Sequence, residues 1–233
     1  MMGSGPNNKM DNVKTKPTHA EIVSARRRAL AESCSAAFGN ELEFVWEIGC
    51  GHGHFLTAYA KAHPSSFCVG IDIVLDRIER AERKRERARL TNLRFMRAEA
   101  RDFIAALPVG ACFSEIYMLF PDPWPKRRHH KHRLLDSSFL EEVAQRTGQG
   151  TRFFFRTDHE PYFAAAKAAF ASHPDWDTCP SGEWPFEIPT IFQQKAPHYC
   201  SLVATRNLHK PESGRKGLHK FPLPPVSASH FGC

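Results

Sequence analysis

A proline-rich stretch, Leu119 to Arg133, contains the residue types that chemistry on a polyanion needs. Prolines at 121, 123 and 125 exclude a helix or strand, because each lacks an amide N–H donor and fixes its own φ angle. One carboxylate, Asp122, and one large aromatic side chain, Trp124, stand between them. Basic residues follow at positions 126, 127, 128, 131 and 133, and we expect all five to bind phosphates. The alternative is a solvated basic loop after an edge strand, but such a loop needs no rigid prolines.

Histidines at positions 129, 130 and 132 are interleaved with these basic residues, so a metal site is a second alternative. Zinc sites usually combine histidine with cysteine or carboxylate ligands. No cysteine is near in the sequence, and the one acid, Asp122, already has a role. We therefore predict that this stretch binds no metal.

A glycine-rich turn marks a second site for chemistry. The sequence Phe44 to Gly53 predicts a strand followed by a tight turn with glycines at 49, 51 and 53, and a helix follows from Phe55. A second short strand then ends in Asp72, about twenty residues beyond the glycines, where an acid typically binds ribose hydroxyls. The third glycine is out of register for a dinucleotide motif. A nucleoside cofactor such as S-adenosylmethionine therefore fits better than NAD.

The remaining strands also end in acids. Residues 92–96 predict a third strand before Glu99, which could meet an adenine amino group or favour the start of the helix near Arg101. Residues 115–120 predict a fourth strand before the proline-rich stretch, and 151–158 a fifth that ends in Asp158. Further helices at 137–145 and 161–172, with a late strand at 198–205, complete an alternation that predicts an α/β fold with a doubly wound, mostly parallel sheet. Ligands bind at the carboxyl ends of such strands, so five acids, including Glu47, should converge there.

Two helices carry many arginines. In the helix that begins near Thr18, the apolar stripe contains Ile22, Ala25 and Ala29, and Arg26 falls within it, so that its charge must reach past the core to water. For the three arginines at 26–28 we favour a solvated helix face over contact with RNA. The helix over residues 74–90 has charges of both signs at helical spacing, which indicates a solvated structural face.

The whole-chain composition is that of one domain with tails. A net charge of +7 over 233 residues favours an anionic partner such as nucleic acid. The seven irregularly spaced cysteines indicate reduced thiols, and no signal peptide or membrane span is apparent, so we expect a cytoplasmic protein. We expect a disordered arm over residues 1–18, a domain over 19–206 and a flexible tail over 207–233.

These motifs resemble the bacterial tRNA (guanine-N7-)-methyltransferase family over roughly residues 20–206. The most specific segment runs from Phe120 to Arg133, and further matches are Glu47 to Gly53, Gly70 to Asp72, 92–94, 157–162 and 189–192. The resemblance implies a class I, Rossmann-like fold, S-adenosylmethionine as methyl donor, and N7 of the guanine at position 46 of the tRNA variable loop as acceptor. It implies a cofactor site lined by Glu47, Gly49, Gly51, Gly53, Asp72, Glu99 and Asp122. Lys126, Arg127, Arg128, Asp158, Thr190 and Gln193 would face the substrate.

Two positions depart from the family pattern. Ile191 and Gln193 replace a usual lysine and glutamate, which puts the substrate role of Gln193 in question, and Glu99 replaces a usual aspartate. Guanine N7 has a free lone pair and needs no strong base, so we expect Asp122 or Asp158 to stabilise positive charge that develops on the purine. Cys50 is then unnecessary as a nucleophile, and we interpret it as a buried thiol that packs within the turn.

Two rival functions remain open. An amino-methyltransferase on another RNA would also have a proline-containing loop after its fourth strand, although the basic continuation here favours N7. A non-catalytic RNA-binding relative would keep the fold without cofactor affinity, against which the complete set of acids argues. The sequence leaves open whether the protein is a monomer or a homodimer.

Overall fold

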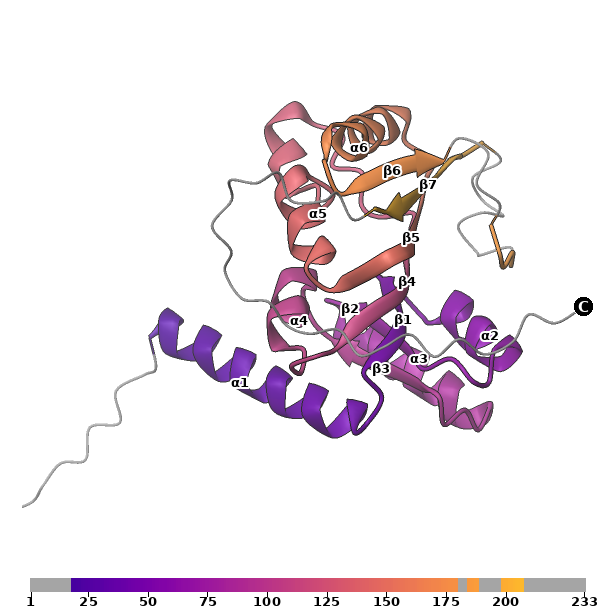
Figure 1. Ribbon diagram of the computed structural model, residues 1–233. Helices are drawn as coiled ribbons and strands as arrows, with labels where there is room; N and C mark the ends of the chain where they lie inside the picture. Colours follow the sequence, from indigo (N-terminus) through magenta and orange to yellow (C-terminus); the bar gives the residue numbers. More distant parts are fainter. Residues whose placement is uncertain (1–17, 180–183, 189–197, 208–233) are drawn as a thin grey trace, which may run out of the picture.

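A computed structural model describes residues 18–179, 184–188 and 198–207 (Figure 1). The expected N-terminal arm and C-terminal tail therefore lie outside the described residues, apart from Thr18 and Asn207. The helices are α1 (His19–Phe38), α2 (His54–Ala62), α3 (Leu75–Arg87), α4 (Ala100–Ala106), α5 (Ser137–Ala144), α6 (Glu160–Ser172) and the 3-10 helix η1 (Arg127–His132). The strands are β1 (Glu43–Ile48), β2 (Cys68–Asp72), β3 (Leu93–Arg97), β4 (Cys112–Leu119), β5 (Thr147–Thr157), β6 (Trp176–Cys179) and β7 (Cys200–Arg206).

The seven strands form one sheet in the order β3-β2-β1-β4-β5-β7-β6. The first five strands in this order run parallel to one another, and β7 pairs antiparallel with both β5 and β6. The predicted α/β fold with a mostly parallel sheet is confirmed. Strand β6 and the helix η1 were absent from the sequence prediction, because each is a single short element without a clear hydrophobic period.

Helices cover both faces of the sheet. The larger apolar cluster joins one face to α1, α4, α5 and α6, with Trp46, Phe103 and Phe113 stacked at its centre. The smaller cluster joins the other face to α2 and α3, and Trp184 and Phe186 pack against it from the segment 184–188. At roughly 25 cal/mol per Å² of apolar surface, burial in these two clusters is the main stabilising contribution to the fold.

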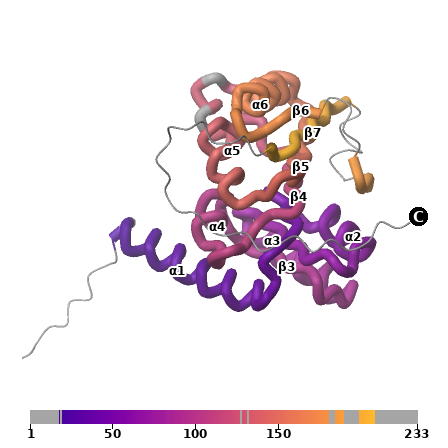
Figure 2. Tube along the Cα trace, viewed as in Figure 1, coloured from indigo at the N-terminus to yellow at the C-terminus, as the bar shows by residue number. Residues whose placement is uncertain are grey.

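Helix α1 begins where the sequence predicts, with Thr18 as N-cap in a capping box with Glu21. Only its C-terminal half packs well, through the buried residues Cys34 and Phe38, and it lies along α4 (Figure 2). The predicted stripe was wrong, because Ile22, Ala25 and Ala29 are exposed. The N-terminal half of α1 extends beyond the sheet, and its Arg27 forms an ion pair with Asp102 of α4.

Candidate active site at the carboxyl edge of the sheet

Five acidic residues lie at or near the carboxyl ends of five adjacent parallel strands. Glu47 is the penultimate residue of β1 and Asp72 is the last residue of β2. Glu99, Asp122 and Asp158 follow β3, β4 and β5 within three residues. Because these strands are neighbours and parallel, the structure brings all five acids to one edge, where doubly wound sheets bind their ligands.

The glycine turn between β1 and α2 combines a packed end with an open end. Gly49, Gly51 and Gly53 have φ angles of 71°, 54° and 68°, a backbone region that favours glycine. A Cβ atom on Gly53 would lie 2.5 Å from Cζ of Phe95, whereas nothing lies within 4 Å of one built on Gly49 or Gly51. Gly53 is therefore required for packing of the turn on β3, and the other two leave room for a ligand beside the backbone.

Asp72 is tied to this turn by its carboxylate. Its Oδ2 accepts a hydrogen bond from the amide of Gly51 at 3.1 Å, and its Oδ1 accepts from the amide of Val74 at 2.8 Å. Arg77 on α3 adds an ion pair at 3.4 Å. A carboxylate has about four lone-pair sites, so capacity remains for a ribose hydroxyl.

Glu47 lies buried beneath the turn. Burial raises its pKa from 4.5 to about 8, an effect that the nearby Asp72 strengthens and that the Leu56 amide and Lys84 oppose. Its Oε2 atom has no hydrogen-bond partner among the described residues. An unpaired buried carboxyl oxygen favours a ligand that brings a positive charge or an N–H donor.

Lys84 on α3 is a residue that sequence reasoning missed. Its Nζ donates to the backbone carbonyl of His52 at 2.8 Å, which holds the turn from the helix side. Together with Arg77, it shows that α3 carries more than the solvated charges predicted for it. The i,i+4 pair Arg80–Asp76 does fit that prediction. No spacing signal in the sequence separates the two kinds of position.

Cys50 is a buried thiol within the turn. Desolvation, with the nearby Glu47 and Asp72, raises its pKa well above 9. A protonated thiol is a poor nucleophile, which agrees with the interpretation of Cys50 as a packing residue.

Glu99 is exposed and caps helix α4. Its Oε2 accepts hydrogen bonds from the amides of Arg101 at 2.9 Å and Asp102 at 3.1 Å. The structure thus realises one of its two predicted roles, at the start of a helix. No described residue donates a hydrogen bond to Oε1, which keeps the predicted contact with an adenine amino group stereochemically open.

The proline-rich loop presents its two functional side chains to solvent. Asp122 is exposed, and the Trp124 side chain is 38% exposed, with its ring 5.0 Å from that of His132. Phe120 and Trp124 have positive φ angles of 50° and 45°, which is unusual for bulky residues. The ring of Trp124 therefore lies at the surface rather than in the core beneath the loop.

Arg133 holds this loop from below. Its Nε donates to the backbone carbonyl of Pro123 at 2.9 Å, and its guanidinium lies 5.0 Å from the ring centre of Tyr162. The residue is only 8% exposed. The expectation that Arg133 binds phosphate was wrong, because its side chain folds back under the loop instead of facing water.

The other basic residues of the loop lie on or beside η1. Lys126 and Arg128 are exposed, and Arg128 donates to a ring nitrogen of His129 at 3.2 Å. Arg127 is the first residue of η1, at the same end of the sheet. Within the described part of the chain, no group of three histidine, cysteine or acidic side chains is arranged to hold a metal ion.

Beyond β5, the structure describes part of the predicted substrate side. Asp158 is exposed directly after the strand, whereas Thr190 and Gln193 lie outside the described residues. Arg156, only 4% exposed, forms two hydrogen bonds with Glu187 at 2.7 and 3.1 Å, and its guanidinium lies 3.8 Å from the ring centre of Trp184. It therefore fixes the segment 184–188, and an arginine directly after the apolar run 153–155 was the sequence signal for it.

Comparison with known sequences identifies the relatives of this chain. A family model described as "Putative methyltransferase" matches residues 41–198. The tRNA (guanine-N(7)-)-methyltransferase of Zymomonas mobilis subsp. mobilis is 31% identical over 186 residues, which cover 77% of this chain and 78% of the relative. The enzyme of that name from Syntrophotalea carbinolica is 38% identical over 134 residues, 58% of each chain. The one from Thermus thermophilus is 32% identical over 145 residues, 62% of this chain and 47% of the relative.

Comparison with solved structures supports the fold. TrmN from Thermus thermophilus superposes with a TM-score of 0.52 at 19% identity, covering 78% of this chain and 48% of that one. Cofactor-bound Rv0187 from MTB gives a TM-score of 0.50 at 14% identity, covering 82% and 98%. At such identities the likeness concerns the fold alone, which is that of class I S-adenosylmethionine-dependent methyltransferases. Since a family model matches more than half of it and a 31%-identical relative aligns with 77% of it, the chain belongs to the tRNA (guanine-N(7)-)-methyltransferase family.

Proposed function

We propose that this protein transfers a methyl group from S-adenosylmethionine to N7 of a guanine in tRNA, at position 46 of the variable loop. One observation supports this most: the glycine turn and the Asp122 loop lie at the carboxyl ends of the adjacent strands β1 and β4. A nucleoside-binding turn therefore adjoins a rigid loop that carries a carboxylate, an aromatic ring and a basic helix.

The residues at the turn fit S-adenosylmethionine. The open space at Gly49 and Gly51 suits close approach of the methionine part, and Asp72 has spare capacity for the ribose hydroxyls. The unpaired Oε2 of Glu47 suits a cationic group, and Glu99 suits the adenine amino group. When bound, this cofactor supplies an electrophilic methyl group on a positively charged sulfur.

The protein's contribution is alignment and charge stabilisation. Guanine N7 attacks with its own lone pair, so no residue has to remove a proton before transfer. As the methyl group transfers, positive charge appears on the purine, and a nearby carboxylate stabilises that charge. Asp122 and Asp158 follow neighbouring strands β4 and β5 and are both exposed, so either can face the guanine.

The proline-rich loop and the basic residues that follow it bind the substrate. Lys126 and Arg128 are exposed and available to phosphates, and we assign the same role to Arg127. Trp124, 38% exposed, offers a ring face on which an unstacked base could rest. Thr190 and Gln193 complete the proposed substrate side. Because the proposed substrate is tRNA, we expect the protein to act in the cytoplasm.

A methyl-transfer assay tests the proposal. Radiolabelled S-adenosylmethionine should label tRNA, and tRNA with 7-deazaguanosine at position 46 should stay unlabelled, because that analogue lacks the nucleophilic nitrogen. Borohydride reduction and aniline cleavage should then cut the product at one site. Label that persists on the 7-deaza substrate, or resists aniline cleavage, would point to an exocyclic amino group instead.

A further inference from the structure

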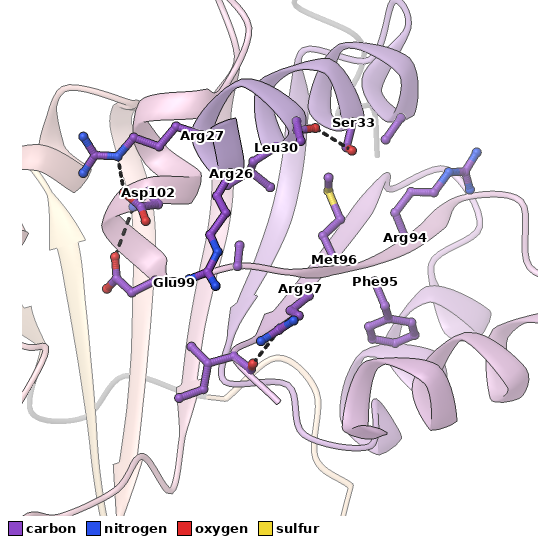
Figure 3. Close-up of a pocket in the computed structure, with 14 residues that line it drawn as sticks. Arg26, Arg27, Leu30, Ser33, Arg94, Phe95, Met96, Arg97, Glu99 and Asp102 are labelled. Atoms are coloured by element: carbon purple, nitrogen blue, oxygen red, sulfur yellow. Dashed lines mark hydrogen bonds and ion pairs between the residues drawn. The ribbon is translucent and has the colours of Figure 1, made fainter. Parts of the chain in front are cut away.

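A groove runs between α1 and the edge strand β3, three positions along the sheet from β4, which leads into the proline-rich loop (Figure 3). It has a volume of about 720 Å³. Apolar side chains of both elements, among them Leu30, Met96 and Ala98, line it. Four arginines also line it, two from α1 (Arg26 and Arg27) and two from β3 (Arg94 and Arg97).

Two of these arginines have guanidinium N–H groups that donate to no acceptor among the described residues. Arg26 makes no hydrogen bond or ion pair within the described ranges, and it reaches from α1 across the groove in Figure 3. Arg97 uses its Nε to donate to the backbone carbonyl of Ile73 at 3.1 Å, and its Nη groups have no acceptor among the described residues. Both side chains belong to exposed residues, and like charges that share a groove favour an anion between them.

The acids at the groove do not balance this charge. Asp102 is already paired with Arg27 at 2.8 Å, and Glu99 caps α4 with one of its oxygens. Against four arginines there are only these two carboxylates, so the groove keeps a net positive charge. Arg94 is partly engaged by the carbonyls of Thr91 and Leu93, each at 2.8 Å, which orients rather than neutralises it.

The occupant must therefore be anionic, which excludes the ends of the chain itself. Residues 1–17 contain three lysines and one aspartate, and residues 208–233 contain four basic residues and one glutamate. Both ends are cationic and would be repelled. A free phosphate ion would leave most of the groove and its apolar lining empty, whereas a nucleic acid strand brings regularly spaced phosphates together with sugar and base surface.

We infer that the α1–β3 groove binds the phosphodiester backbone of the same tRNA whose guanine reaches the Asp122 loop. This inference rests on the proposed function. Three strand spacings separate β3 from β4, roughly 14 Å at about 4.8 Å each, a distance that a folded tRNA spans easily. Phosphate contacts of this kind add affinity and fix the orientation of the RNA without reading its sequence. The α1 side of the groove precedes residues 41–198, the part of the chain that the family model matches.

Arg26→Gln is the sharpest test, since Arg26 has no internal partner to lose among the described residues. Its matched control is Arg87→Gln, an exposed arginine of α3 on the opposite face of the sheet with the same loss of charge. Direct binding of tRNA, without cofactor, should weaken by about 3–10-fold in Arg26→Gln, and the slope of log affinity against log salt should fall by about 1. Arg87→Gln should match the wild type in both.

The double variant Arg26→Gln/Arg97→Gln should lose more affinity for tRNA, with an unchanged dissociation constant for S-adenosylmethionine. Equal tRNA affinity and salt slope in Arg26→Gln and Arg87→Gln would overturn the inference. So would a loss confined to cofactor binding, or binding of inorganic phosphate that does not compete with tRNA. If the wild type binds tRNA through the groove but does not methylate it, the proposed function fails and the groove stands.

Discussion

At the scale of single residues, the two exposed carboxylates Asp122 and Asp158 can be separated by substitution. We expect one of the two variants Asp122→Asn and Asp158→Asn to lower the single-turnover rate of methyl transfer by about 10²-fold. The slower variant identifies the carboxylate nearer the guanine, because an amide cannot stabilise the developing positive charge equally. Since both residues are exposed, the free energy of unfolding should change by less than about 0.5 kcal/mol. Rapid-quench assays and denaturant titrations measure the two quantities. Wild-type rates in both variants would contradict the assigned role.

Glu47 makes the stability of the protein depend on pH. Its pKa is raised to about 8 in the folded state, so the folded protein holds a proton that the unfolded chain releases near pH 4.5. The stabilisation from this proton is complete below pH 4.5 and is lost as the pH rises through 8. Between pH 6 and 8 the loss should be about 2 kcal/mol.

Glu47→Gln should remove that part of the pH dependence, because glutamine does not titrate. Urea unfolding at pH 6 and pH 8 on both proteins provides the measurement, with Glu115→Gln as a control carboxylate on the neighbouring strand. A wild-type pH slope in Glu47→Gln would show that some other group titrates.

At the scale of elements, the glycine turn allows a matched pair of substitutions. Gly51→Ala and Gly53→Ala both place an alanine at positive φ, which costs about 1 kcal/mol each. Only the second also forces a methyl group to within 2.5 Å of Phe95. Gly53→Ala should therefore lose about 1–3 kcal/mol more stability, while Gly51→Ala should mainly weaken binding of S-adenosylmethionine. Thermal unfolding and calorimetry distinguish the two, and equal stability of the variants would refute the packing argument.

The proline-rich loop gives a second matched pair. Arg133→Met keeps the volume of the side chain but removes its bond to the Pro123 carbonyl, so we expect lower stability by about 1–3 kcal/mol and slower transfer. Arg128→Met, at an exposed residue of η1, should leave stability unchanged and raise the KM for tRNA. Melting curves and steady-state kinetics provide the readout. The same effect from both variants would mean that Arg133 does not support the loop.

The elements themselves could mostly be predicted from the sequence. Apolar runs, together with the glycines and prolines that interrupt them, predicted β1 to β5, β7 and the six α-helices, because these features depend on local residue order. Strand β6 is short and is held by pairing with β7, and the segment 184–188 is held by the Arg156–Glu187 pair, so local residue order predicts neither. The reversed role of Arg133 has the same cause: a basic run does not reveal which side chain turns inward.

The same limit holds for the candidate site. The five acids are far apart in the sequence, and the order of the strands brings them together. This clustering could be predicted from the fold class alone. The contacts of Arg77 and Lys84 with the turn depend on how α3 is rotated about its axis, which charge spacing does not determine.

At the scale of the whole molecule, the net charge of +7 predicts how salt affects the reaction. The KM for tRNA should rise steeply between 50 and 200 mM salt, about 10-fold or more if several phosphates are contacted, whereas the KM for S-adenosylmethionine should barely change. Steady-state assays over a salt series test this. An equal response of both substrates would indicate that salt acts on the protein rather than on the RNA interface. No helix in the described part of the chain is long and apolar enough to cross a membrane.

The arginines of β3 have one more consequence, for self-association. A strand at the border of a sheet has unpaired backbone groups that can recruit a strand from another copy of the chain. Arg94 and Arg97 place charge at both ends of this border strand, and α1 runs beside it. The features that we assign to RNA binding would then also keep concentrated protein from aggregating edge to edge whenever no RNA is bound.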